Sequence, residues 1–274
     1  MSEKTNASYI LDGNKAFLDY LRRYRTAEVC GKFFRHCIKD NSDILDCGCG
    51  PGSVTLGLAE WASSGKTIGI DLNGDQFEIA RASAEEKGIS NIEFQKASIY
   101  ELPFEDNQFD LVFSQAVFVH IPDHKKAMSE IHRVLKPGGY VALRDIINSL
   151  ILISPSDPLV DKLRLLFRQG MTASGGDPDI GLSLGQLLLD NHFDELEVSV
   201  EWEHSPNHEF RTEYFANHVD VFDKGEFGDL AVKEGWVTES ERQKIGEHCR
   251  NLANNPAAIW GLPFVQALAR KPMS

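Results

Sequence analysis

Short apolar runs alternate with amphipathic helical segments through residues 43–144, and this alternation limits the folds open to the chain more than any other feature. The expected strands are 43–47, 66–71, 92–96, 110–113 and 140–144. The expected helices are 53–62, 73–88 and 123–136. Strands that alternate with helices of about ten to fifteen residues form βαβ units. The sequence therefore predicts an α/β protein with a doubly wound, mostly parallel sheet.

The alternation weakens on both sides of this segment. Residues 1–40 have a helical pattern and are expected to form an N-terminal cover on a core formed by residues 41–145. Beyond the core we expect an apolar segment at 146–155, helices at 159–168, 182–191 and 211–255, and strands at 195–203 and 264–270. We interpret residues 146–274 as the remaining strands of the sheet with an inserted helical cap over its ligand-binding edge.

The charge of the chain restricts its partners. There are 28 Lys and Arg residues against 41 Asp and Glu residues, a net charge of −13. A nucleic-acid backbone and an anionic membrane surface both require a basic face, so neither is an expected partner. The N-terminal segment has no apolar signal sequence, and the five scattered cysteines are typical of reduced thiols. We expect a cytoplasmic protein, monomeric or homodimeric, that acts on a small molecule.

A glycine-rich loop follows the first expected strand and opens the next helix. It runs from Asp46 to Gly52 with glycines spaced as G-x-G-x-G, and Asp71 lies 19 residues further on, at the end of the second strand. Glycines let a backbone approach a ligand, and an acidic residue after the second strand can accept both ribose hydroxyls of a nucleoside. The loop therefore predicts a nucleoside-containing cofactor.

The spacing distinguishes between two such cofactors. A dinucleotide site has the pattern G-x-G-x-x-G with a pyrophosphate at the helix N-terminus, and the carboxylate of Asp46 would repel that group. The same carboxylate suits a cationic aminoacyl group. This favours S-adenosylmethionine over NAD, although an NAD-dependent oxidoreductase remains the alternative.

The motifs Asp46-Cys-Gly-Cys-Gly-Pro-Gly52, Gly69-Ile-Asp71-Leu, Leu102-Pro-Phe104, Phe109-Asp-Leu-Val-Phe and Leu135-Lys-Pro-Gly-Gly139 occur in a characteristic order. Together they resemble the class I S-adenosylmethionine-dependent methyltransferases of the ubiquinone/menaquinone-biosynthesis type, over residues 40–145. The segments Arg25–Glu28, Ala142–Asp145 and 175–179 more loosely resemble a group of bacterial and fungal small-molecule methyltransferases. The resemblance implies a seven-stranded Rossmann-like sheet with S-adenosylmethionine as cofactor and S-adenosylhomocysteine as product.

The resemblance also implies roles for individual residues. The positions expected to contact the cofactor are Tyr9, Tyr24, Arg25, Asp46, Gly48, Cys49, Gly50, Gly52, Asp71, Leu72, Gln76, Ser98, Ile99 and Gln115. Within this set the glycine loop would hold the methionine part, Asp71 the ribose and Leu72 the adenine. Ser98 stands where the family usually has an Asp for the adenine amino group. Gln115 would lie near the sulfonium, and Arg25 is expected to bind the methionine carboxylate.

His120 is the candidate catalytic residue. It follows the fourth strand, at the edge where acceptors reach the methyl group, and its ordinary pKa range suits a general base. A histidine that caps the helix near Pro122 is the competing interpretation. No metal is expected, because the Cys47-x-Cys49 pair has no second pair to complete a zinc site. The predicted function is in-line transfer of a methyl group to an O, N, C or S atom of a small molecule. A protein that binds S-adenosylmethionine without methyl transfer remains a further alternative.

Overall fold

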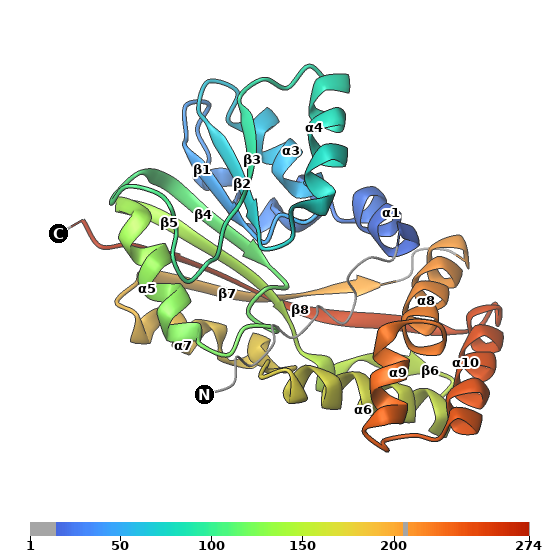
Figure 1. Ribbon diagram of the computed structural model, residues 1–274. Coiled ribbons are helices and arrows are strands. Elements are labelled where there is room, and N and C mark those ends of the chain that lie inside the picture. The colour runs from blue at the N-terminus through green and yellow to red at the C-terminus, as the bar shows by residue number, and fades with distance from the viewer. Residues whose placement is uncertain (1–14, 205–207, 274) are drawn as a thin grey trace.

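A computed structural model describes residues 15–204 and 208–273, and its centre is one sheet of eight strands in the order β3-β2-β1-β4-β5-β8-β6, with β7 paired to β8 (Figure 1). The strands are β1 (Ile44–Cys47), β2 (Thr67–Asp71), β3 (Ile92–Lys96), β4 (Phe109–Gln115), β5 (Leu135–Ile146), β6 (Leu152–Ser154), β7 (Asp194–His204) and β8 (Ile259–Arg270). The pairs among β1 to β5 are parallel, whereas β8 is antiparallel to β5, β6 and β7. The predicted doubly wound, mostly parallel sheet is confirmed.

The strand count is one higher than predicted, because β6 forms within the apolar segment 146–155. Strand β8 begins at Ile259 rather than at 264, so its first residues extend beyond the end of β5. Leu152 and Ser154 pair with Gly261 and Ile259 of this extension. A three-residue strand gives no alternating pattern long enough to identify from sequence.

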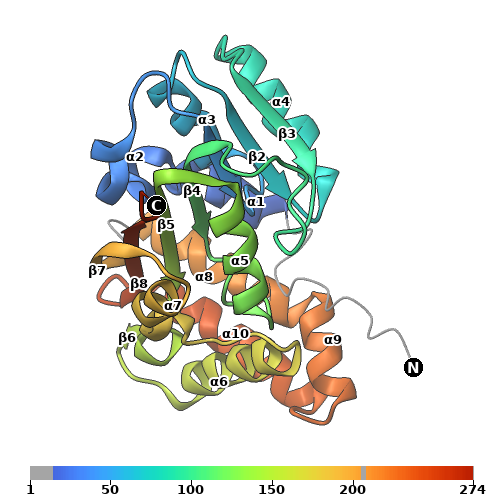
Figure 2. The same ribbon diagram turned by 90° about the vertical axis from the view of Figure 1, so that its left-hand side faces the viewer.

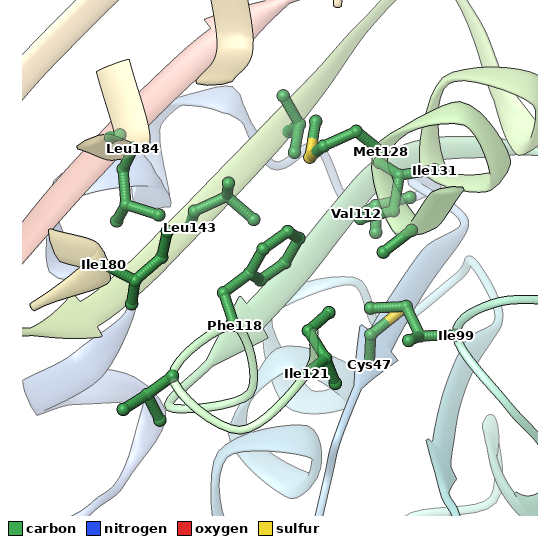
Figure 3. Packing of buried hydrophobic residues seen from close by; sticks show 14 of the residues in the cluster. Cys47, Ile99, Val112, Phe118, Ile121, Met128, Ile131, Leu143, Ile180 and Leu184 are labelled. Atoms are coloured by element: carbon green, nitrogen blue, oxygen red, sulfur yellow. The ribbon is translucent and has the colours of Figure 1, made fainter. Parts of the chain in front are cut away.

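Helices cover both faces of the sheet, as the alternation of side chains along each strand requires. They include α2 (Ala27–Cys30) and α3 (Ser53–Trp61) on one face, and α5 (His124–Val134) and α7 (Leu184–Asp190) on the other (Figure 2). Leu111 and Phe113 of β4 pack with the first pair, and Val112 between them packs with the second. Figure 3 shows Phe118, which follows β4, packed between Leu143 of β5 and Ile121.

A group of helices lies where β8 begins, beyond the carboxyl edge of the parallel strands (Figure 1). They are α6 (Pro158–Ala173), α8 (His208–Asp223), α9 (Glu226–Lys233) and α10 (Glu239–Ala253). The expected single helical stretch 211–255 is thus three helices, interrupted near Gly225 and Gly235, the second of which has a φ of 71°. Thr238 and Glu241 form a capping box that begins α10. These helices share a hydrophobic cluster of their own and form the cap.

The N-terminal helix α1 (Lys15–Tyr24) joins the cap to the core. Arg22 donates a hydrogen bond to Ser83 of α4 (Phe77–Glu86), at 3.2 Å. Arg23 forms an ion pair of 2.8 Å with Glu213 of α8. The helix therefore lies across the carboxyl edge, where the sequence predicts a cover. Within the two described ranges, no helix has the length and apolar character needed to cross a membrane.

Candidate functional site

The glycine loop turns sharply at the carboxyl end of β1. The amide groups of Gly48 and Cys49 both donate to the carbonyl of Ile70, at 2.8 and 2.9 Å. Gly48, Gly50 and Gly52 have φ values of 82°, 50° and 77°, in the left-handed region that only glycine adopts without strain. A Cβ atom at position 48 would also overlap Cγ2 of Val117, just after β4. Glycine at these positions therefore lets the loop take this path without backbone strain.

Asp71 lies directly against the loop. One oxygen of its carboxylate accepts a hydrogen bond of 2.9 Å from the Gly50 amide, and the other accepts one of 3.0 Å from the Asn73 amide. The pairing of β1 with β2 brings the two motifs together, although 21 residues separate them in the chain. The carboxylate is half-buried and remains within reach of a ligand at the edge.

Asp46, in β1, lies in a buried environment that affects its ionisation. Its side chain is buried and accepts a 2.6 Å hydrogen bond from the hydroxyl of Thr55 in α3. Burial, with a smaller contribution from the Asp71 charge, raises the pKa of Asp46 to about 7, despite the opposing effect of Thr55. Thr55 was not among the expected site residues, because a hydroxyl in the first turn of a helix is too common to indicate a partner.

Two glutamines leave orphaned acceptors at the same edge. The Oε1 atoms of Gln76, before α4, and Gln115, at the end of β4, are buried without a hydrogen-bond partner in residues 15–204 and 208–273. A buried acceptor without a partner is destabilising, so such atoms point to a missing donor. Leu72, directly after β2, is 62% exposed and offers an apolar surface that a flat ring would cover. The orphaned acceptors, the glycine loop and this apolar surface fit a nucleoside cofactor with an aminoacyl group.

The expected adenine contacts lie after β3. The hydroxyl of Ser98 accepts a hydrogen bond of 3.2 Å from the Tyr100 amide, so it stabilises its own turn. The side chain of Ile99 is buried in the core.

Cys49 belongs to the glycine loop. Its thiol is buried and has a pKa well above its ordinary value because of burial and the nearby carboxylates of Asp46 and Asp71. Cys49 therefore contributes its backbone and its small size to the loop, rather than a reactive thiolate.

The N-terminal residues are placed differently from the expectation. Tyr9 lies outside the described residues, and Tyr24 packs against Tyr20 with ring centroids 5.1 Å apart. Arg25 forms two hydrogen bonds, of 3.1 and 3.3 Å, with the carboxylate of Glu203 in β7. Its charge is thereby neutralised within the protein, so this geometry does not support the expected contact with the methionine carboxylate.

Glu203 is the centre of a buried polar cluster that the sequence did not indicate. It accepts a hydrogen bond of 3.0 Å from Tyr20, and its carboxylate lies 3.9 Å from the guanidinium of Arg144. Burial alone would raise the pKa of Glu203, but Arg25 and Arg144 lower it below its ordinary value. Arg144 also lies over the ring of Phe264, at 3.8 Å from its centroid. The cluster holds α1, β5 and β7 together at the edge of the site.

A cavity of about 140 Å³ lies between this edge and the cap. Ala116, Val119 and His120 line it from the loop after β4. Side chains of α6, in the cap, and of β8, in the sheet, line its other walls.

His120 is buried in this wall. Burial lowers the pKa of His120 to about 4, so its imidazole is neutral at physiological pH. Asp123, rather than His120, caps α5, because its side chain accepts a 3.0 Å hydrogen bond from the Lys126 amide. Of the two interpretations of His120, the helix cap is therefore wrong.

No group of three or more His, Cys, Asp or Glu side chains is placed to hold a metal ion in the part of the chain that the structure describes.

The sequence is similar to methyltransferases. Residues 38–172 match a methyltransferase domain family. An uncharacterized methyltransferase of Schizosaccharomyces pombe is 32% identical over 196 residues, which cover 69% of this chain and 70% of that protein. A demethylmenaquinone methyltransferase of Lactococcus lactis is 43% identical over 99 residues, but these cover only 36% of this chain and 39% of that enzyme. These matches give no support to the NAD alternative.

The fold is shared with solved structures as well. The YcgJ protein of Bacillus subtilis superposes with a TM-score of 0.57 at 20% identity, covering 89% of this chain and 98% of that one. In sequence, the chain matches 44% of the length of the same protein, named as an uncharacterized methyltransferase, at 34% identity. The similarity in structure thus extends over more of both chains than the similarity in sequence.

Proposed function

Because the chain belongs to the class I S-adenosylmethionine-dependent methyltransferases, we propose that it methylates a small molecule bound in the cavity between the sheet edge and the cap. The contact between Gly48 and Val117 carries this proposal. It joins the loop expected to hold the cofactor to the segment from Ala116 to His120, which lines the cavity. A ligand in the cavity would therefore lie next to the cofactor loop.

The chain's own residues would hold the cofactor in distinct ways. Asp71 would accept hydrogen bonds from the ribose hydroxyls, and Leu72 would pack against the adenine. Gln76 and Gln115 would use their orphaned acceptors, since neither Oε1 atom has a partner among the described residues. Asp46 would act as an anion towards the aminoacyl group above pH 7, where its carboxyl ionises. When bound, S-adenosylmethionine supplies an electrophilic methyl group on its sulfonium.

Alignment and water exclusion are the main catalytic tasks of the protein in this proposal. The cavity walls are mostly apolar, so they would displace water from the acceptor and fix its orientation. His120 would accept a proton from an acceptor that carries one, because its imidazole is neutral down to about pH 4. Its place in the cavity wall supports this role.

The proposal also covers the cellular compartment of the enzyme, the class of its acceptor and its oligomeric state. All five cysteines are free thiols, consistent with a reducing compartment such as the cytoplasm. The net charge of −13 favours small molecules over nucleic acids as acceptors. We expect a monomer or a homodimer, which light scattering would distinguish.

Calorimetric titration with S-adenosylhomocysteine tests the proposal directly. The wild type should bind one equivalent per chain, and Asp71→Ala should lose most of this affinity. Asp75→Ala, which removes an exposed carboxylate four residues away, is the matched control and should bind like the wild type. A wild type that does not bind would contradict the assignment of the cofactor site.

A further inference from the structure

The size of the cavity limits the part of the acceptor that enters it. Its volume is about 140 Å³. An apolar cavity of about 150 Å³ in another protein holds one benzene molecule. Phe167 of the cap, with Trp260 and Phe264 of β8, lines this cavity with aromatic side chains. One six-membered ring fills this space, and a second fused ring would extend beyond it.

The charges around the cavity restrict the acceptor further. Among the described residues that line it, none is an aspartate or a glutamate, while Arg25 and Arg164 both contribute to the wall. The charge of Arg25 is balanced by Glu203, at 3.1 Å, and that of Arg164 by Asp161, at 3.5 Å. A cationic amine would lose its hydration in this apolar space and meet no carboxylate in return. The cavity therefore suits a neutral ring.

Two buried polar atoms indicate the substituent that this ring carries. Asn148 is only 4% exposed, and within the described part of the chain its Oδ1 atom has no hydrogen-bond partner. The Nε atom of Arg164 is also buried, with no partner in that part of the chain. The Arg164 guanidinium lies 3.4 Å from the carbonyl oxygen of Ser149, the residue after Asn148, so both atoms belong to the same region of the wall. One atom requires a donor and the other an acceptor.

We propose that the acceptor is a neutral, single-ring hydroxylated compound of the phenol type. Its hydroxyl group donates to Asn148 and accepts from Arg164, while the ring packs against the aromatic wall. This assignment rests on the proposed function, since it names the class of molecule that occupies the same cavity. A hydroxyl is the smallest group that satisfies both orphaned atoms at once.

Binding to the protein saturated with S-adenosylhomocysteine tests the proposal without a need for turnover. Calorimetry should show phenol binding about tenfold more tightly than toluene, the effect of one buried polar contact. Benzylamine and naphthol should bind more weakly than phenol, the first because of its charge and the second because of its size. Equal affinities for phenol and toluene, or tighter binding of naphthol, would overturn the proposal.

Two variants separate the polar contact from general effects on folding. Asn148→Leu should weaken the preference for phenol over toluene, because only the contact with Arg164 remains, while S-adenosylhomocysteine still binds. Asn251→Leu, at an exposed position on α10, should keep the full preference. An undiminished preference in Asn148→Leu would overturn the role of Asn148, and the wild-type ligand series remains decisive if this variant does not fold. Loss of S-adenosylhomocysteine binding by the wild type would instead contradict the proposed function itself.

Discussion

Gly48 and Val117 are in contact across the carboxyl edge of the sheet, so closely that no side chain fits at position 48. Gly48 belongs to the loop after β1, and Val117 belongs to the segment between β4 and α5. The contact joins the expected cofactor loop to the wall of the cavity. A substitution in the loop should therefore alter the cavity wall, and a substitution in the wall should alter the loop.

Replacement of the glycine tests this contact. Gly48→Ala should lower the free energy of unfolding by about 1–2 kcal/mol for the left-handed backbone and a further ~1–3 kcal/mol for overpacking against Val117. Gly50→Ala has the same backbone strain, but its Cβ would meet only Oε1 of Gln76, at an ordinary 3.6 Å. Urea unfolding of both variants checks this difference. Equal losses of stability would show that the contact with Val117 is unimportant.

The raised pKa of Asp46 should be visible in the pH dependence of stability. An aspartate in the unfolded chain titrates near pH 3.9, whereas Asp46 in the folded protein has a pKa of about 7. Between these values the folded protein binds a proton that the unfolded chain does not, so its stabilising effect is complete below about pH 4 and is lost as pH rises to about 7. The loss is on the order of 4 kcal/mol.

Asp46→Asn isolates this effect because it keeps an acceptor for Thr55 and removes the titration. The difference in unfolding free energy between the wild type and Asp46→Asn should change as pH rises from about 4 to about 7, and remain level above that range. Other titrating groups such as Asp145, whose pKa burial also raises to about 7, are shared by both proteins and cancel. Parallel stability curves would contradict the buried state of Asp46.

The pair formed by Glu203 and Arg25 should dominate the stability of the site's edge. Glu203→Ala leaves Arg25 and Arg144 buried without their counter-charge, which should lower the free energy of unfolding by about 3–5 kcal/mol. Glu197→Ala removes an exposed carboxylate from the same strand and should change it by no more than about 0.5 kcal/mol. Chemical unfolding at neutral pH compares the two. Similar values for both variants would mean that the cluster has no structural role.

His120 should affect turnover rather than cofactor binding. Once an acceptor with an ionisable proton is known, His120→Ala should lower kcat about 100-fold and leave the affinity for S-adenosylhomocysteine unchanged. Because only the neutral imidazole accepts a proton, the wild-type rate should fall as pH decreases towards about 4, and the variant should lose this pH dependence. His218→Ala, in the same cavity wall, should raise KM with little change in kcat. A normal kcat in His120→Ala would exclude the residue as a base.

The core of the fold could be predicted because its signals are local. Alternation of strands and helices through residues 43–144 identified β1 to β5, and adjacent parallel strands necessarily place their loops at one edge. The contact between Gly50 and Asp71 follows from that topology alone. Even the split of 211–255 into three helices had a local signal, in Gly225 and Gly235.

The remaining features depend on pairs that lie far apart in the chain. Arg25 and Glu203 are 178 residues apart, and nothing near either residue indicates the other. The expected contact of Arg25 with the methionine carboxylate came from the family resemblance, which gives no information about Glu203. Strand β6 depends in the same way on the extension of β8. Long-range pairs of this kind form only when the chain folds, so the residues near either partner do not predict them.

A crystal structure with bound S-adenosylhomocysteine tests the central claim most directly, because the claim concerns the place of the cofactor relative to the cavity. The account predicts that the adenosine contacts Asp71 and Leu72, with the sulfur facing Ala116 and His120 at the cavity wall. A sulfur atom directed away from the cavity, or an adenosine bound elsewhere on the protein, would contradict it.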